Sequence, residues 1–146
     1  MATRSTIALE FADGTVEQIY CHWDGYLEHN GQILLQYYKD PFKVRDLIDG
    51  GSVSSLAPSV DKPEGHSFDK SVDGYTVFYA RDRGEDLVKN KFKDYADYRA
   101  NAQGEEYNYI LRRDGKWYVE FYGEFDGLLE QAIKDEQDAR AQEETA

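Results

Sequence analysis

Residues 6–23 read TIALEFADGTVEQIYCHW, and this stretch decides the fold. Apolar and polar residues alternate on both sides of Asp13-Gly14, a dipeptide that tolerates the positive φ angles of a tight hairpin turn. The pattern predicts two antiparallel strands joined at that turn. The apolar residues expected on one face of this hairpin are Ile7, Leu9, Phe11, Val16 and Ile19.

A second hairpin is predicted at residues 107–123, which read YNYILRRDGKWYVEFYG. Here too the residues alternate on both sides of an Asp-Gly pair, Asp114-Gly115. Between the hairpins, residues 75–80 (YTVFYA) are rich in β-branched and aromatic side chains, which is typical of a strand. Two hairpins and this middle strand predict an antiparallel sheet of about five strands.

Three to four helices are expected to pack on the sheet, so the predicted fold class is α+β. Asn30 offers an N-cap for a helix over residues 31–38, and Asp40 offers another before a proline. Weaker patterns predict a helix over residues 95–103 and a C-terminal helix capped near Asp126. The helix after Asp40 has an apolar stripe made of Phe42, Val44, Leu47 and Ile48.

The length of 146 residues is typical of one domain, which we place at residues 1–135. Residues 51–74 contain several Ser and Pro and have weak periodicity, so they are expected to form a long loop. Residues 136–146 are predicted to form an acidic tail that is frayed or disordered.

The C-terminal segment carries much of the charge of the chain. From Gly123 onward eight acidic residues outnumber two basic ones, which is half of the net charge of −12. One interpretation is a solvated helix end, since charge runs usually lie in solvent. The other is an acidic strip that a basic protein recognises. The residues of this strip are Asp126, Glu130, Asp135, Glu136 and Asp138.

The composition limits the classes of partner. A net charge of −12 opposes direct binding to nucleic acid or to anionic lipid, because affinity for phosphates comes largely from Lys and Arg. Basic proteins would instead be attracted. A single cysteine excludes an intramolecular disulfide. The sequence has no secretory signal and no apolar run long enough for a membrane span, so the expected location is the cytoplasm.

The stretch CHWDGY, residues 21–26, is the first candidate site. At a strand end His22 and Asp24 would point to the same side, because side chains alternate along a strand. Together with Trp23 and Tyr26 they could surround a ligand. The alternative is that the Asp-Gly pair is simply the turn that ends the hairpin, with the aromatic side chains packed beneath it.

A second candidate lies in EGHSFD, residues 64–69, where His66 and Asp69 belong to a glycine-containing loop. Loops often carry functional residues. An Asx or Ser turn would explain the same residues without any ligand.

The third candidate is YARDRGED, residues 79–86. Arg81 and Arg83 lie on the same side of an extended segment, and guanidinium groups can bind phosphate in a bidentate way. With Tyr79 stacked on a base, they could hold a nucleotide. The alternative is that these arginines make surface ion pairs with the neighbouring acids.

No complete catalytic or metal-binding pattern can be read, so no catalytic residue, metal ligand or cofactor is predicted. Cys21 is expected to be a small core residue, because His22 beside it would point to the opposite side of a strand. A catalytic zinc would need three protein ligands, and the spacing of the histidines does not match a known zinc motif.

Four segments of the chain resemble small proteins encoded by tailed bacteriophages and prophages. They are TIALEFADGTVEQIYCHWDGYLEHNGQILLQYY (6–38), GHSFD (65–69), YTVFYARDRGE (75–85) and EEYNYILRRDGKWYV (105–119). The resemblance covers most of residues 4–122. It implies a context, a small acidic nonstructural phage product made in the cytoplasm of a bacterial host, and no catalytic residue or fold. Such products are often inhibitors of host enzymes or antagonists of host defence.

Three functional hypotheses follow. The first is a host-takeover or counter-defence protein that binds a basic host protein stoichiometrically, steered by charge and anchored by aromatic side chains. The second is a sponge that sequesters a small nucleotide immune signal. The third is a small hydrolase with His22 or His66 as general base. We favour the first, because charge and aromatic content are properties of the whole chain.

Overall fold

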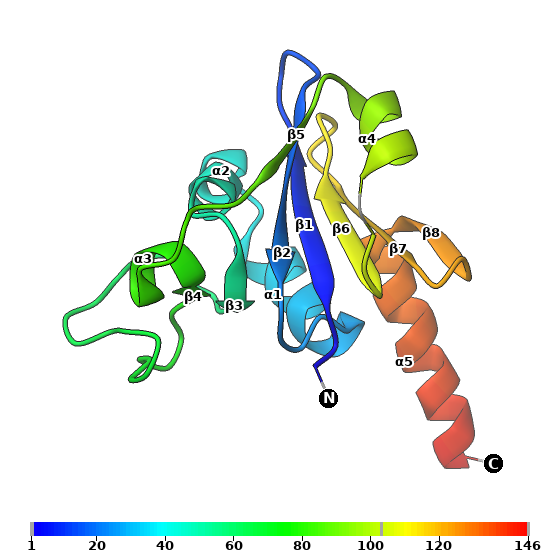
Figure 1. The fold of residues 1–146 in the computed structure, drawn as a ribbon. Helices are drawn as coiled ribbons and strands as arrows, with labels where there is room; N and C mark the ends of the chain where they lie inside the picture. The colour runs from blue at the N-terminus through cyan, green and yellow to red at the C-terminus, as the bar shows by residue number, and fades with distance from the viewer. Residues whose placement is uncertain (1, 103, 146) are drawn as a thin grey trace.

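The hairpin around Asp13-Gly14 lies at the centre of the sheet (Figure 1). The computed structural model describes residues 2–102 and 104–145. Strands β1 (Ser5–Glu10) and β2 (Val16–Cys21) pair antiparallel, with Ile7 opposite Ile19. The Asp13 carboxylate accepts hydrogen bonds from the Thr15 N–H at 3.0 Å and from its hydroxyl at 2.7 Å. Gly14 has a φ of 93°, so the predicted turn is confirmed.

The sheet is larger than predicted, and it is mixed. Its order is β4-β3-β2-β1-β6-β7-β8, and β5 also pairs with β2. The β1–β6 and β2–β3 pairs are parallel. The expectation of about five antiparallel strands was therefore wrong, because the two hairpins join side by side through their first strands. The remaining strands are β3 (Val53–Ser55), β4 (Val77–Phe78), β5 (Asn90–Phe92), β6 (Tyr107–Leu111), β7 (Trp117–Phe121) and β8 (Phe125–Leu128).

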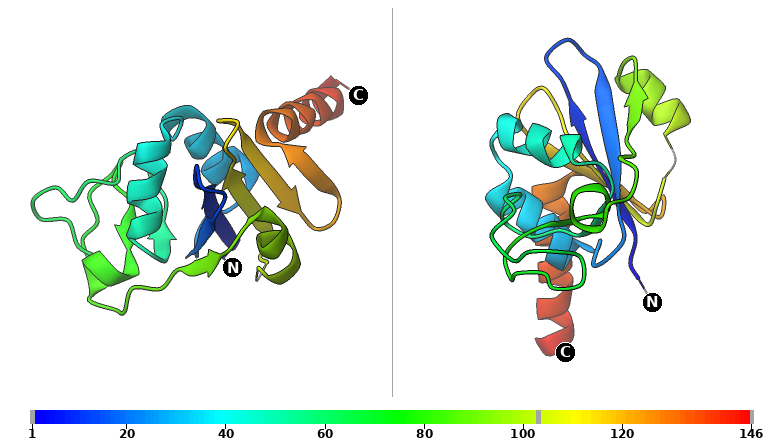
Figure 2. Two further views of the ribbon diagram at one scale, coloured as in Figure 1. Left: turned by 90° about the horizontal axis from the view of Figure 1, so that it is seen from above. Right: turned by 60° about the vertical axis from the view of Figure 1, so that its left-hand side comes forward.

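The helices divide between the two faces of the sheet. Helices α1 and α2 lie on one face and α4 lies on the other (Figure 2). A single π-helical turn, η1, leads directly into α1. The helical elements are η1 (Leu27–Gly31), α1 (Gln32–Tyr37), α2 (Pro41–Asp49), α3 (Tyr79–Arg83), α4 (Tyr95–Asn101) and α5 (Leu129–Thr145).

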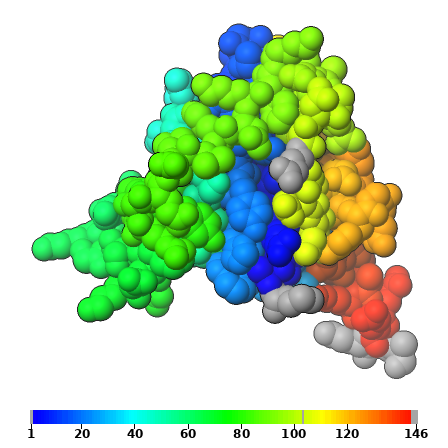
Figure 3. All heavy atoms as spheres, viewed as in Figure 1, coloured from blue at the N-terminus to red at the C-terminus, as the bar shows by residue number. Residues whose placement is uncertain are grey.

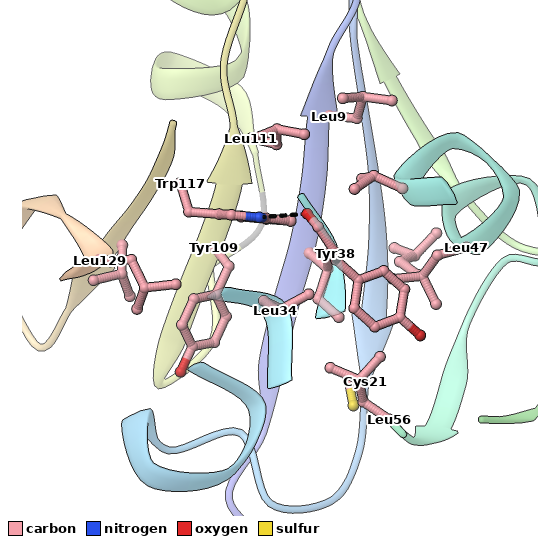
Figure 4. Packing of buried hydrophobic residues seen from close by; sticks show 14 of the residues in the cluster. Leu9, Cys21, Leu34, Tyr38, Leu47, Leu56, Tyr109, Leu111, Trp117 and Leu129 are labelled. Carbon is pink, nitrogen blue, oxygen red and sulfur yellow. Dashed lines mark hydrogen bonds between the residues drawn. The ribbon is translucent and has the colours of Figure 1, made fainter. Parts of the chain in front are cut away.

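The main core fills the space between the sheet and helices α1, α2 and α5 (Figure 4). Two large aromatic side chains in this core have polar groups, and both of these groups form hydrogen bonds. Trp117 donates its indole N–H to the Tyr38 carbonyl at 2.9 Å, and Tyr109 donates its hydroxyl to the Gly25 carbonyl at 2.6 Å. A buried tyrosine or tryptophan needs such a partner, so these bonds fix how the helices sit on the sheet.

A smaller apolar cluster lies on the opposite face and consists of Ala8, Val16, Tyr98 and Ile110. Val16 was predicted on the same face as Ile7, but it pairs with Glu10 and therefore points to the other side. Phe42 was predicted in the buried stripe of α2. It is 76% exposed, because Val44, Leu47 and Ile48 alone make the buried face of that helix.

Several element boundaries differ from the sequence prediction. The Asp40 N-cap is confirmed, since its side chain accepts the Phe42 N–H at 2.9 Å. Asn30 does not cap a helix, because η1 already encloses it. Helix α3 contains Tyr79 and Ala80, predicted as the end of a strand, and Arg81 to Arg83, predicted as an extended segment. Asp126 lies in β8 instead of capping the last helix, which begins at Leu129.

Helix α5 runs to Thr145, over residues for which the sequence predicts a frayed tail; residue 146 lies outside the described residues. Arg140 contributes to its order through ion pairs with Glu28 of η1 and with Glu136 one turn earlier. No helix in the described ranges has the length and apolar character that a membrane crossing requires.

Tyr38→Phe tests the packing of α1 against the loop after β3. Tyr38 is fully buried, and its hydroxyl donates to the Ala57 carbonyl at 2.6 Å and lies 3.3 Å from the Thr76 hydroxyl. Its loss should lower the free energy of unfolding by about 1 kcal/mol in urea denaturation. Tyr37→Phe is the matched control, because that ring is 49% exposed; equal effects of the two changes would contradict this placement.

Candidate functional site

The face of the sheet on which α4 packs, called here the α4 face, carries polar side chains across five strands. The strand register places them in line from β2 through β1, β6 and β7 to β8. We call this set the polar row; its members are Tyr20, Thr6, Asn108, Glu120 and Asp126. The opposite face at the same strands is filled by the main core.

Asn108 is at the centre of the polar row. Its side-chain carbonyl accepts the Thr6 hydroxyl at 2.8 Å, and its amide donates to the Glu120 carboxylate at 2.9 Å. The same amide also donates to the Glu105 carbonyl at 2.9 Å, while the Glu105 N–H donates back to Asn108. These bonds fix the Glu120 carboxylate at one position on the sheet.

A cleft of about 400 Å³ lies above this part of the sheet and is called here the α4 cleft. Figure 3 looks onto the α4 face. Atoms of β1 and β2 lie there between the segment 80–92 and the strands β6 to β8. A smaller hollow of about 50 Å³ adjoins the cleft at Gln18. The cleft is lined by Gln18, Tyr98, Arg99, Ala102, Gly104, Asn108, Glu120, Gly123, Glu124, Phe125 and Asp126.

The charged side chains that line the α4 cleft are mostly acidic. Three carboxylates, Glu120, Glu124 and Asp126, accompany one guanidinium, that of Arg99. Arg99 donates through both terminal nitrogens to Asp126, which ties the end of α4 to β8. Partial burial by itself lowers the pKa of Arg99, but the hydrogen bond and charge of Asp126 outweigh it and raise that pKa. Burial raises the pKa of Tyr98, so its hydroxyl stays neutral.

The stretch CHWDGY forms a turn. Asp24 has a φ of 57°, and its carbonyl accepts the Asn30 N–H at 3.2 Å. Gly25 is required there, because a Cβ would come within 2.7 Å of the Ser5 side chain and 2.9 Å of the Thr3 carbonyl. The buried Asn30 side-chain amide connects the two sides of the turn. It donates to the Ser5 hydroxyl, the Cys21 sulfur and the Trp23 carbonyl.

His22 and Asp24 do not form the pair that the strand alternation predicted. The His22 Nδ1 lies 2.7 Å from the Tyr20 hydroxyl, and the His22 ring meets Trp23 edge-on. Trp23 and Tyr26 are 45% and 37% exposed, so they form surface beside the turn instead of packing under it. All of these side chains lie outside the lining of the α4 cleft.

Cys21 is a buried core residue, as expected. Burial raises the pKa of its thiol to about 11, although hydrogen bonds from Asn30 and Ser5 act in the opposite direction. A thiol of this kind is neutral at physiological pH and is a poor nucleophile.

His66 and Arg81 come together, around the buried carboxylate of Asp82. His66 Nδ1 accepts the Val72 N–H at 3.0 Å, and its Nε2 lies 3.2 Å from the Thr76 carbonyl and 3.4 Å from Asp82. The side chains of His66 and Asp82 are completely buried. His66 thus has no exposed atom with which to act as a general base; it fastens the long loop.

Arg81 is committed to the same cluster. Its guanidinium donates to Asp82 and to three carbonyls, those of Val60, Asp61 and Thr76. Burial alone raises the pKa of Asp82, but hydrogen bonds from Arg81 and the Phe78 N–H outweigh it and lower that pKa. Few donors of Arg81 remain for a phosphate.

Of the other members of the predicted nucleotide site, Arg83 and Tyr79 meet at the Phe68 ring. Arg83 is exposed, pairs with Glu85 at 3.4 Å and lies over the Phe68 ring. Tyr79 packs against the same ring, at 5.8 Å between centroids. Asp69 is exposed at the tip of a turn between residues 67 and 70.

The residues of the predicted acidic strip lie in four different places. Asp126 lines the α4 cleft, Glu130 lines a separate hollow beside Trp117, and Asp135 and Asp138 are exposed on α5. Glu136 turns inward against η1 and shares a hydrogen bond with Glu28. Of the residues singled out from the sequence, only Asp126 lines the α4 cleft.

Sequence reasoning missed Gln18, Arg99, Asn108 and Glu120. For Gln18, Asn108 and Glu120 the available signal was that polar residues occupy alternate positions of both predicted hairpins, while Arg99 lies on the predicted helix 95–103. This signal could not show which strands become neighbours, so it could not bring these four residues together.

Comparison with protein-family models, with curated proteins and with solved structures found no match for this chain. Among the residues that the structure describes, no three His, Cys, Asp or Glu side chains are grouped so that they could hold a metal ion. The function is therefore inferred from the geometry and charge of the α4 face.

Arg81→Ala should destabilise the protein even without any ligand. The change leaves the buried Asp82 carboxylate without its main partner, which we expect to cost about 2–3 kcal/mol of the free energy of unfolding. Arg83→Ala removes only an exposed ion pair and should change that free energy by less than about 0.5 kcal/mol. Urea denaturation of both variants checks this; similar values would contradict the anchoring role of Arg81.

The Glu28–Glu136 contact predicts a pH dependence. Burial, followed by the hydrogen bond and charge of Glu28, raises the pKa of Glu136 to about 7, from an ordinary 4.5. Its protonated form thus adds stability that is fully present below pH 4.5 and is lost as pH rises through 7.

Thermal and urea unfolding between pH 5 and 8 measure this loss. The lowered pKa of Glu28 and the partial solvent exposure of the pair offset part of this loss. We therefore expect the free energy of unfolding to fall by about 1 kcal/mol over this range. Glu136→Gln should flatten the profile, whereas Glu130→Gln on the exposed side of α5 should retain it. A free energy of unfolding that does not change with pH in the unmodified protein would refute the hydrogen bond between protonated Glu136 and Glu28.

Proposed function

We propose that this protein acts by stoichiometric binding to a basic protein, with the α4 face as its contact surface. The observation that carries the proposal is the α4 cleft, in which three carboxylates accompany one arginine on a sheet face that the helices leave partly uncovered. An acidic cleft attracts Lys and Arg side chains and raises the rate at which a basic partner is encountered.

The resemblance to phage-encoded proteins supports a bacterial host as the source of that partner, and the host cytoplasm as the place of action. In this proposal the chain is a host-takeover or counter-defence protein. Its net charge of −12 favours a partner that itself binds nucleic acid, because such a protein presents a basic surface.

The other two hypotheses have less support. A nucleotide sponge would need free guanidinium groups, but Arg81 is engaged with Asp82 and with backbone carbonyls. A hydrolase would need an accessible base beside a cleft. His66 is buried, and His22, which contacts Tyr20 and Trp23, lies outside the lining of the α4 cleft.

Capture from a bacterial host lysate with matched charge variants tests the proposal. The cleft variant carries Glu120→Gln, Glu124→Gln and Asp126→Asn. The helix variant loses the same three charges on α5, through Asp135→Asn, Asp138→Asn and Glu143→Gln. A partner should be captured by the unmodified protein and by the helix variant, and be lost with the cleft variant.

The captured partner should also dissociate as salt is raised from 50 to about 300 mM, because exposed charges are screened over a Debye length of about 10 Å near 0.1 M. Capture that depends on α5 and not on the cleft would place the contact elsewhere. A partner whose affinity does not change with salt would contradict an electrostatic interface.

A further inference from the structure

We propose that the α4 cleft is an arginine-binding site, and that in the free protein Arg99 holds the place of the partner's arginine. This inference rests on the proposed function and names the side chain that the cleft recognises. On binding, an arginine of the partner would replace Arg99 on Asp126.

The size and charge of the cleft fit a cationic side chain. Its volume of about 400 Å³ is within the range of ligand pockets and allows an extended side chain to enter. Glu120 lies on the floor, held by Asn108, while Glu124 and Asp126 lie at the exposed rim. Phosphates and carboxylates would be repelled from such a lining.

The contacts of Arg99 favour a guanidinium over an ammonium group. Asp126 already binds one guanidinium through both of its terminal nitrogens, which is the forked geometry that lysine cannot supply. Tyr98 of α4 also lines the cleft, whereas the Phe125 ring belongs to the core face, where it stacks on Phe121. Planar guanidinium groups stack on aromatic rings as well as pairing with carboxylates.

Arg99 is suited to being displaced. The Arg99 and Asp126 side chains are 42% and 53% exposed, so their ion pair is weak in solvent. Arg99 belongs to α4, a helix of only seven residues, and its guanidinium can move into solvent without disturbing the core cluster around Tyr98. Arg99 therefore competes with an incoming arginine for Asp126 but does not block its entry into the cleft.

Titration with a capped tetra-arginine peptide, followed by NMR, tests this inference. The Arg99 Nε–H signal should shift as the peptide displaces it. Tetra-lysine of the same charge should bind more weakly, and uncharged tetra-citrulline should not bind. Arg99→Gln should tighten tetra-arginine binding about two- to fivefold, because a competing exposed ion pair is removed. Asp126→Asn should weaken binding by at least as much.

Arg45→Gln and Asp49→Asn are the matched controls. They make the same charge changes in another exposed Arg–Asp pair, 3.9 Å apart on α2, and should leave the affinity nearly unchanged. Thermal unfolding of each variant shows that it is folded.

Two results would overturn the arginine site: equal effects of Arg99→Gln and Arg45→Gln, or tetra-lysine binding as tightly as tetra-arginine. Either can occur while the cleft-dependent capture of a partner remains intact, in which case the proposed function stands. If the cleft variant captured the partner as well as the unmodified protein does, the proposed function itself would be refuted.

Discussion

The structure depends on the complete burial of β1. All six of its residues are buried, and both of its edges are hydrogen-bonded, to β2 on one side and to β6 on the other. A strand in this position needs apolar cover on both faces, since unpaired polar groups inside a protein are costly. Ile7 and Leu9 meet the helices, and Ala8 meets the cluster around Tyr98 on the α4 face.

The two faces of the sheet are used differently. One face is apolar along the strands and holds α1, α2 and α5 through the core around Tyr38 and Trp117. The α4 face has a smaller apolar cluster around Tyr98, where α4 packs, and beside it lies the polar row that ends at Asp126. A sheet whose second face is only partly covered leaves a surface that is available to a partner.

Internal interactions occupy many of the chemically reactive groups. Cys21 and Asn30 stabilise the turn after β2, and His66, Arg81 and Asp82 fasten the loop between β3 and β4. Residues that look catalytic in a sequence are thus used to order loops that have little apolar surface of their own. The carboxylates of the α4 cleft remain near the surface, which is why binding is the function that the geometry supports best.

The sequence by itself determined the local elements: both Asp-Gly hairpins, the capped helix after Asp40 and the acidic character. Each of these follows from neighbouring residues, through turn geometry, capping or charge. Only the tertiary structure decided that β1 and β6 run parallel, that Asp126 belongs to a strand and that Arg99, Asn108 and Glu120 share one cleft. Those contacts join residues far apart in the chain, and strand alternation specifies a face of a strand but not its neighbour.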